Sequence, residues 1–256
     1  MVSITKKMKR TLIAWSIFGL CCLGVGALIW RGLLWFNIPS HHRYPVRGVD
    51  VSHYQGQIDW DVIASQDMTF AFIKATEGSG TTDECFAENW ENARAAGMYV
   101  GAYHFFSFDS PPDTQADNFC AAVPFAYDAM PPVIDLELYR SENLPDAEAV
   151  RHNLRILLKR LKDYYGKTPI IYTTNICWER YLKGSDLEYV LWIRSIFTHP
   201  SASYEPAWEF WQYNPRGLLD GYRGDERFID LNAYCGTREE FEQKYLYEIP
   251  SDPALR

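Results

Sequence analysis

Two kinds of hydrophobic pattern divide the chain. The first is one apolar run, Thr11–Trp30, whose twenty residues include no charged side chain. At a rise of about 1.5 Å per residue, a helix of this length spans the roughly 30 Å hydrocarbon core of a bilayer. Beyond this run, short apolar stretches alternate with amphipathic ones. The pattern therefore predicts one membrane-spanning helix followed by a folded α/β domain.

Eight short apolar stretches have the composition of β-strands. They are Val46–Val51, Thr69–Ala75, Met98–Phe105, Pro132–Glu137, Pro169–Thr173, Tyr189–Ile193, Trp208–Tyr213 and Arg227–Asn232. Helical patterns lie between the early ones, at Asp59–Gln66, Cys85–Ala96, Asp113–Ala122 and Pro145–Tyr165. Strands separated by helices indicate parallel βαβ units, and eight of them predict a barrel. The connections after Tyr172 are irregular, so we do not expect a complete ring of eight helices.

The apolar character continues past Trp30 to Phe36, without a clear cleavage site. This length favours an uncleaved signal anchor that comprises residues 11–36. A cleaved signal peptide is the alternative. The basic cluster from Lys6 to Arg10 predicts that residues 1–10 are cytoplasmic and the domain is not. Residues 37–45 are interpreted as a linker and residues 46–256 as the domain.

Charge is distributed unevenly between these parts. Residues 1–44 carry six Lys or Arg and no Asp or Glu, so removing them from the formal net charge of −8 leaves −14 for the rest. A domain this acidic repels nucleic acid backbones, which excludes nucleic acid as a partner. It also does not attract an anionic cell wall by bulk charge, so any glycan recognition must be local.

Six cysteines fall into two groups. Cys21 and Cys22 lie in the apolar run, and the other four are Cys85, Cys120, Cys177 and Cys235. Outside the cytoplasm these four are permitted to form disulfides, and the sequence does not choose among the three connectivities. No C-x-x-C motif is present, so neither a metal site nor any other cofactor is predicted.

Polar residues recur where the predicted strands end, which in such barrels is the face that carries the chemistry. Asp135 and Glu137 form the most informative pair, because residues i and i+2 of a strand face the same side, roughly 6.6 Å apart. Two carboxyl groups this close in an apolar strand separate their pKa values, as glycosidic bond cleavage requires of its acid and its anion. The structural alternative is that Asp135 pairs with Lys74 or Arg194.

Further strand ends carry candidate site residues. Asp50 lies on the first strand, after the pair Gly48-Val49, and a turn or capping role is the alternative. Tyr103, Tyr172 and Trp211 suit sugar stacking, unless they belong to the core. Asp230 is interpreted either as a substrate contact or as a group that neutralises nearby cations. His53 and His104 lack a ligand set and are predicted to be hydrogen-bonded histidines.

The order of these blocks resembles the family 25 glycoside hydrolases, the cellosyl-type lysozymes. The resemblance rests on residues 48–56 (GVDVSHYQG) and 72–78 (FIKATEG), followed by 101–105, 132–137, 211–213 and 229–232. It implies a modified barrel of five strand–helix units and then three strands. It also implies cleavage between N-acetylmuramic acid and N-acetylglucosamine, with Glu137 as general acid/base. Asp135 would then assist the 2-acetamido group, and Asp50 would complete the acidic cluster.

The chain departs from the family pattern at three positions. The family usually has Gly where Asp67 stands and an aromatic residue near Thr81. Arg194 follows Trp192-Ile193, where Trp-Ile-Ala is common, so a charge is expected near the mouth of the barrel.

Three other functions compete with this one. A chitinase-like hydrolase would need an acid at Val133, and a catalytically silent membrane-anchored glycan-binding barrel would not need the acidic cluster. A membrane-anchored barrel with an unrelated activity would need another explanation for it. The sequence therefore predicts a single-pass bacterial inner-membrane protein whose extracytoplasmic domain acts on peptidoglycan strands.

Overall fold

A computed structural model describes residues 6–138 and 144–245, and these divide into two units between Phe36 and Asn37. The ends of the predicted N-terminus and domain, residues 1–5 and 246–256, lie outside the described residues. The first unit contains helix α1 (Lys6–Trp30), which is long and apolar enough to cross a membrane. Within the described residues the helix also includes Lys6–Arg10, before the apolar run, and this segment contains good helix formers.

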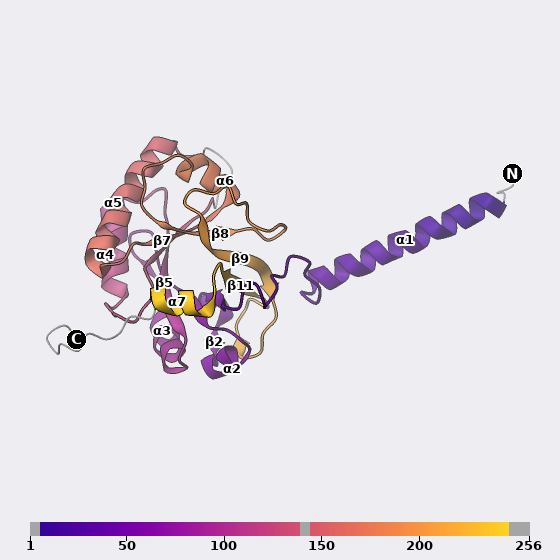
Figure 1. Ribbon diagram of the computed structural model, residues 1–256, viewed down its shortest axis with the longest axis horizontal. Coiled ribbons are helices and arrows are strands. Elements are labelled where there is room, and N and C mark those ends of the chain that lie inside the picture. Colours follow the sequence, from indigo (N-terminus) through magenta and orange to yellow (C-terminus); the bar gives the residue numbers. More distant parts are fainter. Residues whose placement is uncertain (1–5, 139–143, 246–256) are drawn as a thin grey trace. The chain divides into compact units, whose positions relative to one another are not determined.

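The second unit is an eight-stranded mixed barrel, as predicted (Figure 1). Its strands in chain order are β1 (Arg47–Val51), β3 (Phe70–Glu77), β5 (Tyr99–Phe105), β6 (Val133–Leu136), β7 (Ile170–Thr174), β8 (Val190–Arg194), β9 (Trp208–Gly217) and β11 (Ile229–Tyr234). Strand β1 closes the barrel by pairing in parallel with β3 and antiparallel with β11. Strand β9 also pairs antiparallel with β11, while the other neighbouring pairs are parallel.

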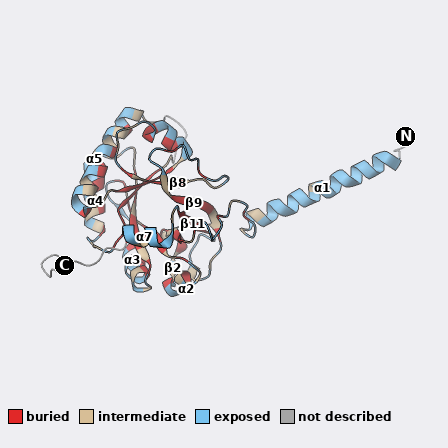
Figure 2. Cartoon of the chain, viewed as in Figure 1, coloured by how far each residue is buried: buried red, intermediate tan, exposed pale blue. Residues whose placement is uncertain are grey.

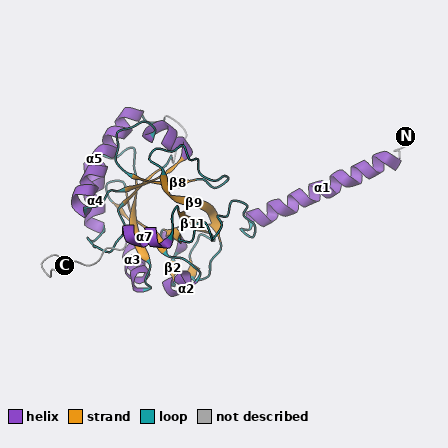
Figure 3. Cartoon of the chain, in the orientation of Figure 1, coloured by secondary structure: helices purple, strands orange, loops and turns teal. Residues whose placement is uncertain are grey.

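Helices cover the first half of the barrel and are short in the second half (Figure 3). The predicted helices are α2 (Trp60–Ser65), α3 (Phe86–Ala95), α4 (Pro112–Ala122) and α5 (Ala147–Tyr165). Asp146 caps the start of α5 by accepting from Ala149 N, and Gly166 ends it in the left-handed conformation. Up to residue 245, where the description ends, the second half has α6 (Asn175–Cys177), the helical turn η2 (Trp178–Leu182) and α7 (Arg238–Tyr245).

The buried residues form two large clusters and a small third one, and Figure 2 shows that the barrel strands are largely buried. The first large cluster lies between the barrel and its helices, and the second fills the inside of the barrel with Phe70, Phe72, Trp192 and Phe210. Gly48 makes room for this filling, because a side chain there would overlap the ring and carbonyl of Phe70. Helix α7 adds Phe241 and Tyr245 to the interior cluster. Aromatic residues therefore fill the barrel interior, and the cavity described below opens at the carboxyl ends of the strands.

The segment predicted as a linker packs on the barrel. The Asn37 side chain donates to the carbonyls of Ser195 and Thr198, at 2.8 and 3.0 Å. Tyr44 is buried, and its hydroxyl lies 2.6 Å from the His199 ring. The folded unit therefore begins at Asn37, several residues earlier than expected.

Candidate active site

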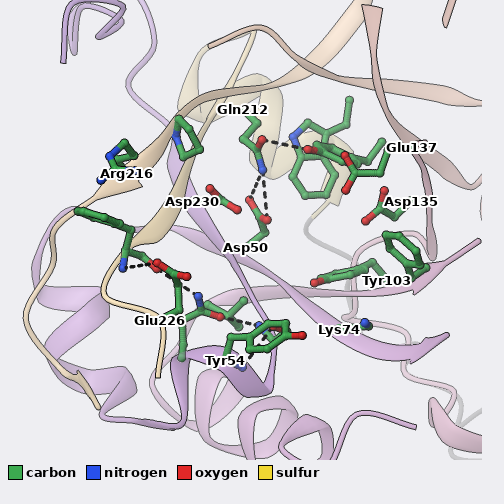
Figure 4. Close-up of a pocket in the computed structure, with 18 residues that line it drawn as sticks. Asp50, Tyr54, Lys74, Tyr103, Asp135, Glu137, Gln212, Arg216, Glu226 and Asp230 are labelled. Atoms are coloured by element: carbon green, nitrogen blue, oxygen red, sulfur yellow. Dashed lines mark hydrogen bonds between the residues drawn. The ribbon is translucent and has the colours of Figure 1, made fainter. Parts of the chain in front are cut away.

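A cavity of about 480 Å³ lies at the carboxyl ends of the barrel strands (Figure 4). We call it the acidic cavity. It is lined by Asp50, Val51, Ser52, Tyr54, Gln55, Lys74, Tyr103, Phe105, Asp135, Glu137, Tyr172, Trp192, Gln212, Pro215, Arg216, Glu226, Phe228 and Asp230. The volume is in the usual range for small-molecule sites. The cavity therefore contains all four acids singled out from the sequence, together with Tyr103 and Tyr172.

Asp50 is fixed by a network of amide donors. Its Oδ1 accepts from Asn232 Nδ2 at 2.6 Å, and its carboxyl group accepts from Gln212 Nε2 at 3.1 and 3.2 Å. Gln212 is oriented by the Tyr172 hydroxyl at 3.0 Å, and Asn232 by the Trp192 ring nitrogen at 2.9 Å. Burial raises the pKa of Asp50, while the two amides oppose that rise. The network joins five strands and holds Asp50 in one orientation.

Asp135 and Glu137 lie together on one side of the acidic cavity (Figure 4). Asp135 is the last residue but one of β6, which is buried along its whole length, and its Oδ1 is a buried atom without a hydrogen-bond partner among the described residues. Burial raises the pKa of Asp135 well above its ordinary value, and Glu137 adds to the rise. Burial also raises the pKa of Glu137, against the opposing charge of Arg194. The pair therefore holds a proton to higher pH than an isolated carboxyl group does.

Asp230 faces Asp50 across the barrel seam, because the two are register partners between β11 and β1. Burial, together with the charge of Asp50, raises the pKa of Asp230 well above its ordinary value. A protonated carboxyl group beside an ionised one avoids like-charge repulsion. The sequence left two roles open for Asp230, substrate contact and neutralisation of nearby cations. Its place in the cavity lining agrees with substrate contact.

Two cations accompany these acids. Lys74 Nζ donates to Glu77 at 2.8 Å, so Glu77 pairs with Lys74. Lys74 still lowers the pKa of Asp135 by its charge. Arg194 ends β8 and lowers the pKa of Asp50, Glu137 and Asp230. The positive charge that the sequence predicts near the mouth of the barrel therefore acts on the acids of the site.

Trp211 does not line the acidic cavity. Side chains alternate along a strand, and on β9 it is Gln212 that points inward. Trp211 is buried in a separate cluster with Tyr44 and Tyr213, and its ring nitrogen donates to the Ser195 carbonyl at 2.8 Å. The sugar-stacking role predicted for Trp211 therefore has no support from its position.

The sequence reasoning missed Tyr54, Trp192 and Arg216 as cavity residues. Tyr54 lies in the motif of residues 48–56, and Trp192 lies two residues before Arg194, so the family resemblance pointed to both positions. Arg216 lies beyond the predicted end of its strand and carried none.

The two histidines near the site have structural partners, as predicted. His104 is fully buried between Thr76 and Gln115, and burial lowers its pKa to about 4. His53 contacts Asp83 at 2.7 Å. Among residues 6–138 and 144–245, no group of His, Cys, Asp or Glu is arranged to hold a metal ion, and all six cysteines are unpaired.

The fold and the site together define a class of protein. An α/β barrel with paired, buried carboxyl groups at the carboxyl ends of its strands has the architecture of a barrel glycoside hydrolase.

Comparison with known proteins narrows this class to one family. Residues 49–222 match the family described as "Glycosyl hydrolases family 25". A structure of a family 25 glycosyl hydrolase from Bacillus anthracis is 48% identical, covers 81% of this chain and 97% of its own, and superposes with a TM-score of 0.76. The chain therefore belongs to glycoside hydrolase family 25.

Two curated relatives have similar identity but different descriptions. Lysozyme M1 of Streptomyces globisporus is 35% identical over 206 residues, which is 75% of this chain and 68% of the relative. The uncharacterized protein YegX of Escherichia coli K12 is 35% identical over 212 residues, which is 81% of this chain and 76% of the relative.

Proposed function

We propose that this protein is a muramidase that hydrolyses the β-1,4 bond between N-acetylmuramic acid and N-acetylglucosamine in peptidoglycan. Membership of family 25 and the lysozyme among its relatives support this substrate class. The observation that carries the proposal is the partnerless Asp135 Oδ1 beside Glu137 in the acidic cavity. A buried acceptor left without a donor is costly, so such an atom is a marker of function.

In the proposed reaction, Glu137 donates its proton to the glycosidic oxygen as the bond breaks. Asp135 Oδ1 accepts a hydrogen bond from the substrate's 2-acetamido N–H, and the fixed Asp50 stabilises the positive charge that develops on the sugar. Water then attacks the anomeric carbon and returns a proton to Glu137. Tyr103, Tyr172 and Asp230 contact the sugars. The net change is the addition of one water across one glycosidic bond.

The test uses the full chain in detergent micelles with purified peptidoglycan, and measures new reducing muramic acid ends. We expect Glu137→Gln to lower kcat by about 10²- to 10⁴-fold, the usual contribution of a general acid. Glu179→Gln, at an exposed residue outside the acidic cavity, is the matched control. Activity that survives Glu137→Gln would exclude this acid, and reducing glucosamine ends would show a different bond specificity. A wild-type protein that binds strands without cutting them would instead be a glycan-binding barrel.

We further propose that α1 is retained as a signal anchor, with the N-terminus in the cytoplasm and the barrel outside the inner membrane. The length of the apolar helix and the basic residues in its first turns support this arrangement. The domain would then meet the wall from the membrane side.

A further inference from the structure

One wall of the acidic cavity is built by two segments far apart in sequence, residues 53–58 and 215–228, and we call it the cavity wall. The first segment contains the helical turn η1 (His53–Gln55) and strand β2 (Gln57–Ile58), and the second contains strand β10 (Tyr222–Arg223). Strand β10 pairs antiparallel with β2, and Gln55 Nε2 donates to the Phe228 carbonyl at 3.2 Å. The cavity wall is therefore a fixed part of the barrel mouth.

Tyr54 is the exposed aromatic residue of the cavity wall. Six aromatic residues line the acidic cavity, and among them Tyr54 alone is more than half exposed, at 58%. Tyr172 and Trp192, by contrast, are buried because they hold the amide network of the site. The backbone of Tyr54 is fixed on both sides, since its N–H donates to Ser52 Oγ at 3.4 Å and its carbonyl accepts from Glu226 N at 2.9 Å. Tyr54 therefore presents an exposed ring from a fixed backbone.

The Tyr54 side chain is supported by its neighbour His53. The two ring centres lie 4.1 Å apart, with 39° between the ring planes. The Asp83 carboxyl group holds His53 at two points, because it accepts from His53 N at 3.0 Å and lies 2.7 Å from His53 Nδ1. The Asp83 side chain is buried and also accepts from Cys85 N at 3.0 Å. A buried group bonded at three points is rigid, so the His53 ring is a firm support for the Tyr54 ring.

An exposed aromatic ring held in this way suits the flat face of a sugar. The C–H groups on one face of a pyranose carry partial positive charge and pack on the negative face of an aromatic ring. Five acids line the cavity, and this contact does not depend on the charge of the substrate. A ring that is already positioned also loses little conformational freedom on binding. Figure 4 shows Tyr54 apart from Asp135 and Glu137, so a sugar on Tyr54 is a neighbour of the bond that is cut.

We propose that Tyr54 is a specificity-determining residue whose ring stacks on one sugar of the glycan strand, and that His53 and Asp83 are positioning residues for that ring. The inference rests on the proposed muramidase function and adds a second point at which the strand is held. Tyr54 then reads the face of a sugar ring and not the attached peptide. A contact away from the reacting bond is made equally in the bound substrate and in the transition state, so it lowers KM and leaves kcat unchanged.

The test compares wild-type full chain, Tyr54→Ala and Tyr54→Phe on intact peptidoglycan and on glycan strands freed of peptide. Tyr164→Ala is the matched control, because Tyr164 is exposed to a similar extent, 50%, and does not line the cavity. Thermal melting is recorded for each variant. Tyr54→Leu, which keeps an apolar side chain without a flat ring, replaces Tyr54→Ala if that variant does not fold.

We expect Tyr54→Ala to raise KM by about 5- to 30-fold on both substrates, the usual effect of losing one apolar contact face. The expected kcat changes by less than about threefold, because the contact lies away from the reacting bond. Tyr54→Phe keeps the ring and should stay within about twofold of wild type, as should Tyr164→Ala.

A double-mutant cycle tests the positioning role of His53. His53→Ala should raise KM without changing kcat, because the Tyr54 ring loses its support, and Asp83→Asn should act in the same direction. In the Tyr54→Ala background, His53→Ala should have no further effect on KM, because the ring that it positions is absent. An equal effect of His53→Ala with and without the Tyr54 ring would show that His53 acts on the fold alone, and would overturn the positioning role.

An equal KM for wild type and Tyr54→Ala would overturn the stacking role and leave the muramidase proposal standing. So would a Tyr54→Phe variant as weak as Tyr54→Ala, which would assign the contact to the hydroxyl group, or an effect confined to intact peptidoglycan, which would assign it to the peptide. If wild type cuts neither substrate, the muramidase proposal fails, and calorimetric binding of peptide-free strands decides the role of Tyr54 separately. Weaker binding by Tyr54→Ala than by Tyr164→Ala would support it, and equal binding would refute it.

Discussion

Asp50, Asp135, Glu137 and Asp230 each lose hydration on folding, and burial raises the pKa of all four. The pKa values of these carboxyl groups are near 4 in the unfolded chain and higher in the folded protein. In the pH range between these values, the folded protein therefore binds more protons than the unfolded chain. Their stability contribution is fully present below pH 4 and is lost as pH rises through the folded values. The site that enables chemistry thus destabilises the fold at neutral pH.

The variant Asp230→Asn measures how much one of these buried charges destabilises the fold at neutral pH. The amide keeps the shape of the side chain and removes one buried charge facing Asp50. We expect the melting temperature at pH 7.5 to rise by about 2–4 °C for each kcal/mol recovered, and the gain to shrink towards pH 4. Differential scanning calorimetry across this pH range measures it, with the exposed Asp220→Asn as control. Equal gains at both ends of the range would contradict the electrostatic origin.

Arg194 is expected to set the alkaline limit of activity. Its charge lowers the pKa of Glu137, against the rise caused by burial. A general acid works only while protonated, so activity falls as pH rises through this pKa. Arg194→Gln should therefore move the alkaline limb of kcat/KM to higher pH, whereas Arg155→Gln, on the exposed side of α5, should not. An unchanged or lowered limb would show that Arg194 does not act on the acid.

The positions and roles of single residues were predictable from the sequence to different degrees. Asp50, Asp135 and Glu137 lie at the carboxyl ends of predicted strands, so their convergence followed from barrel topology. Asp230 joins them for another reason, because β11 runs antiparallel and Asp230 lies near its amino end, opposite Asp50. The stacking role of Trp211 stays a prediction without support from its position, because alternation along β9 directs Gln212 to Asp50 and buries Trp211 in a separate cluster. Asp67 has a left-handed backbone, with φ of 65°, which explains the glycine usual at this position in the resemblance.

At the scale of elements, all eight barrel strands and four of the helices were predictable to within a few residues. Their apolar periods are clear because each is buried on at least one face. Strand β9 was predicted to end at Tyr213, since Pro215 interrupts the pattern, but it continues to Gly217 at the barrel edge. The two-residue strands β2 and β10 are too short to have a period.

The pairing of β2 with β10 depends on Gly224. A side chain there would overlap the backbone of Tyr54, Gln55 and Gly56. We expect Gly224→Ala to cost about 1–3 kcal/mol of folding free energy, as overpacking usually does, and to raise KM by displacing the cavity wall. Thermal melting and turnover of peptidoglycan measure the two effects. Gly80→Ala, with no neighbouring atom within 4 Å, is the control and should change neither. A Gly224→Ala variant as stable as that control would show that the wall is not tightly packed.

The whole molecule is predicted to keep its apolar helix. Expressed in a Gram-negative host, the full chain should fractionate with the inner membrane, resist extraction by salt and retain the mass of the complete sequence. The domain should be digested by protease added to spheroplasts, because the basic N-terminus stays in the cytoplasm. A soluble periplasmic product shortened near residue 36 would identify a cleaved signal instead.

The hydrogen bonds of Asn37 to the barrel have a consequence for where an anchored enzyme works. Only residues 31–36 connect the end of α1 to the first residue of the folded unit. If α1 is retained as proposed, the six residues span about 20 Å when fully extended, so this tether would not carry the barrel into the outer layers of a wall. The working zone would be the innermost glycan layer, and turnover would be limited by how often strands come within that distance of the membrane.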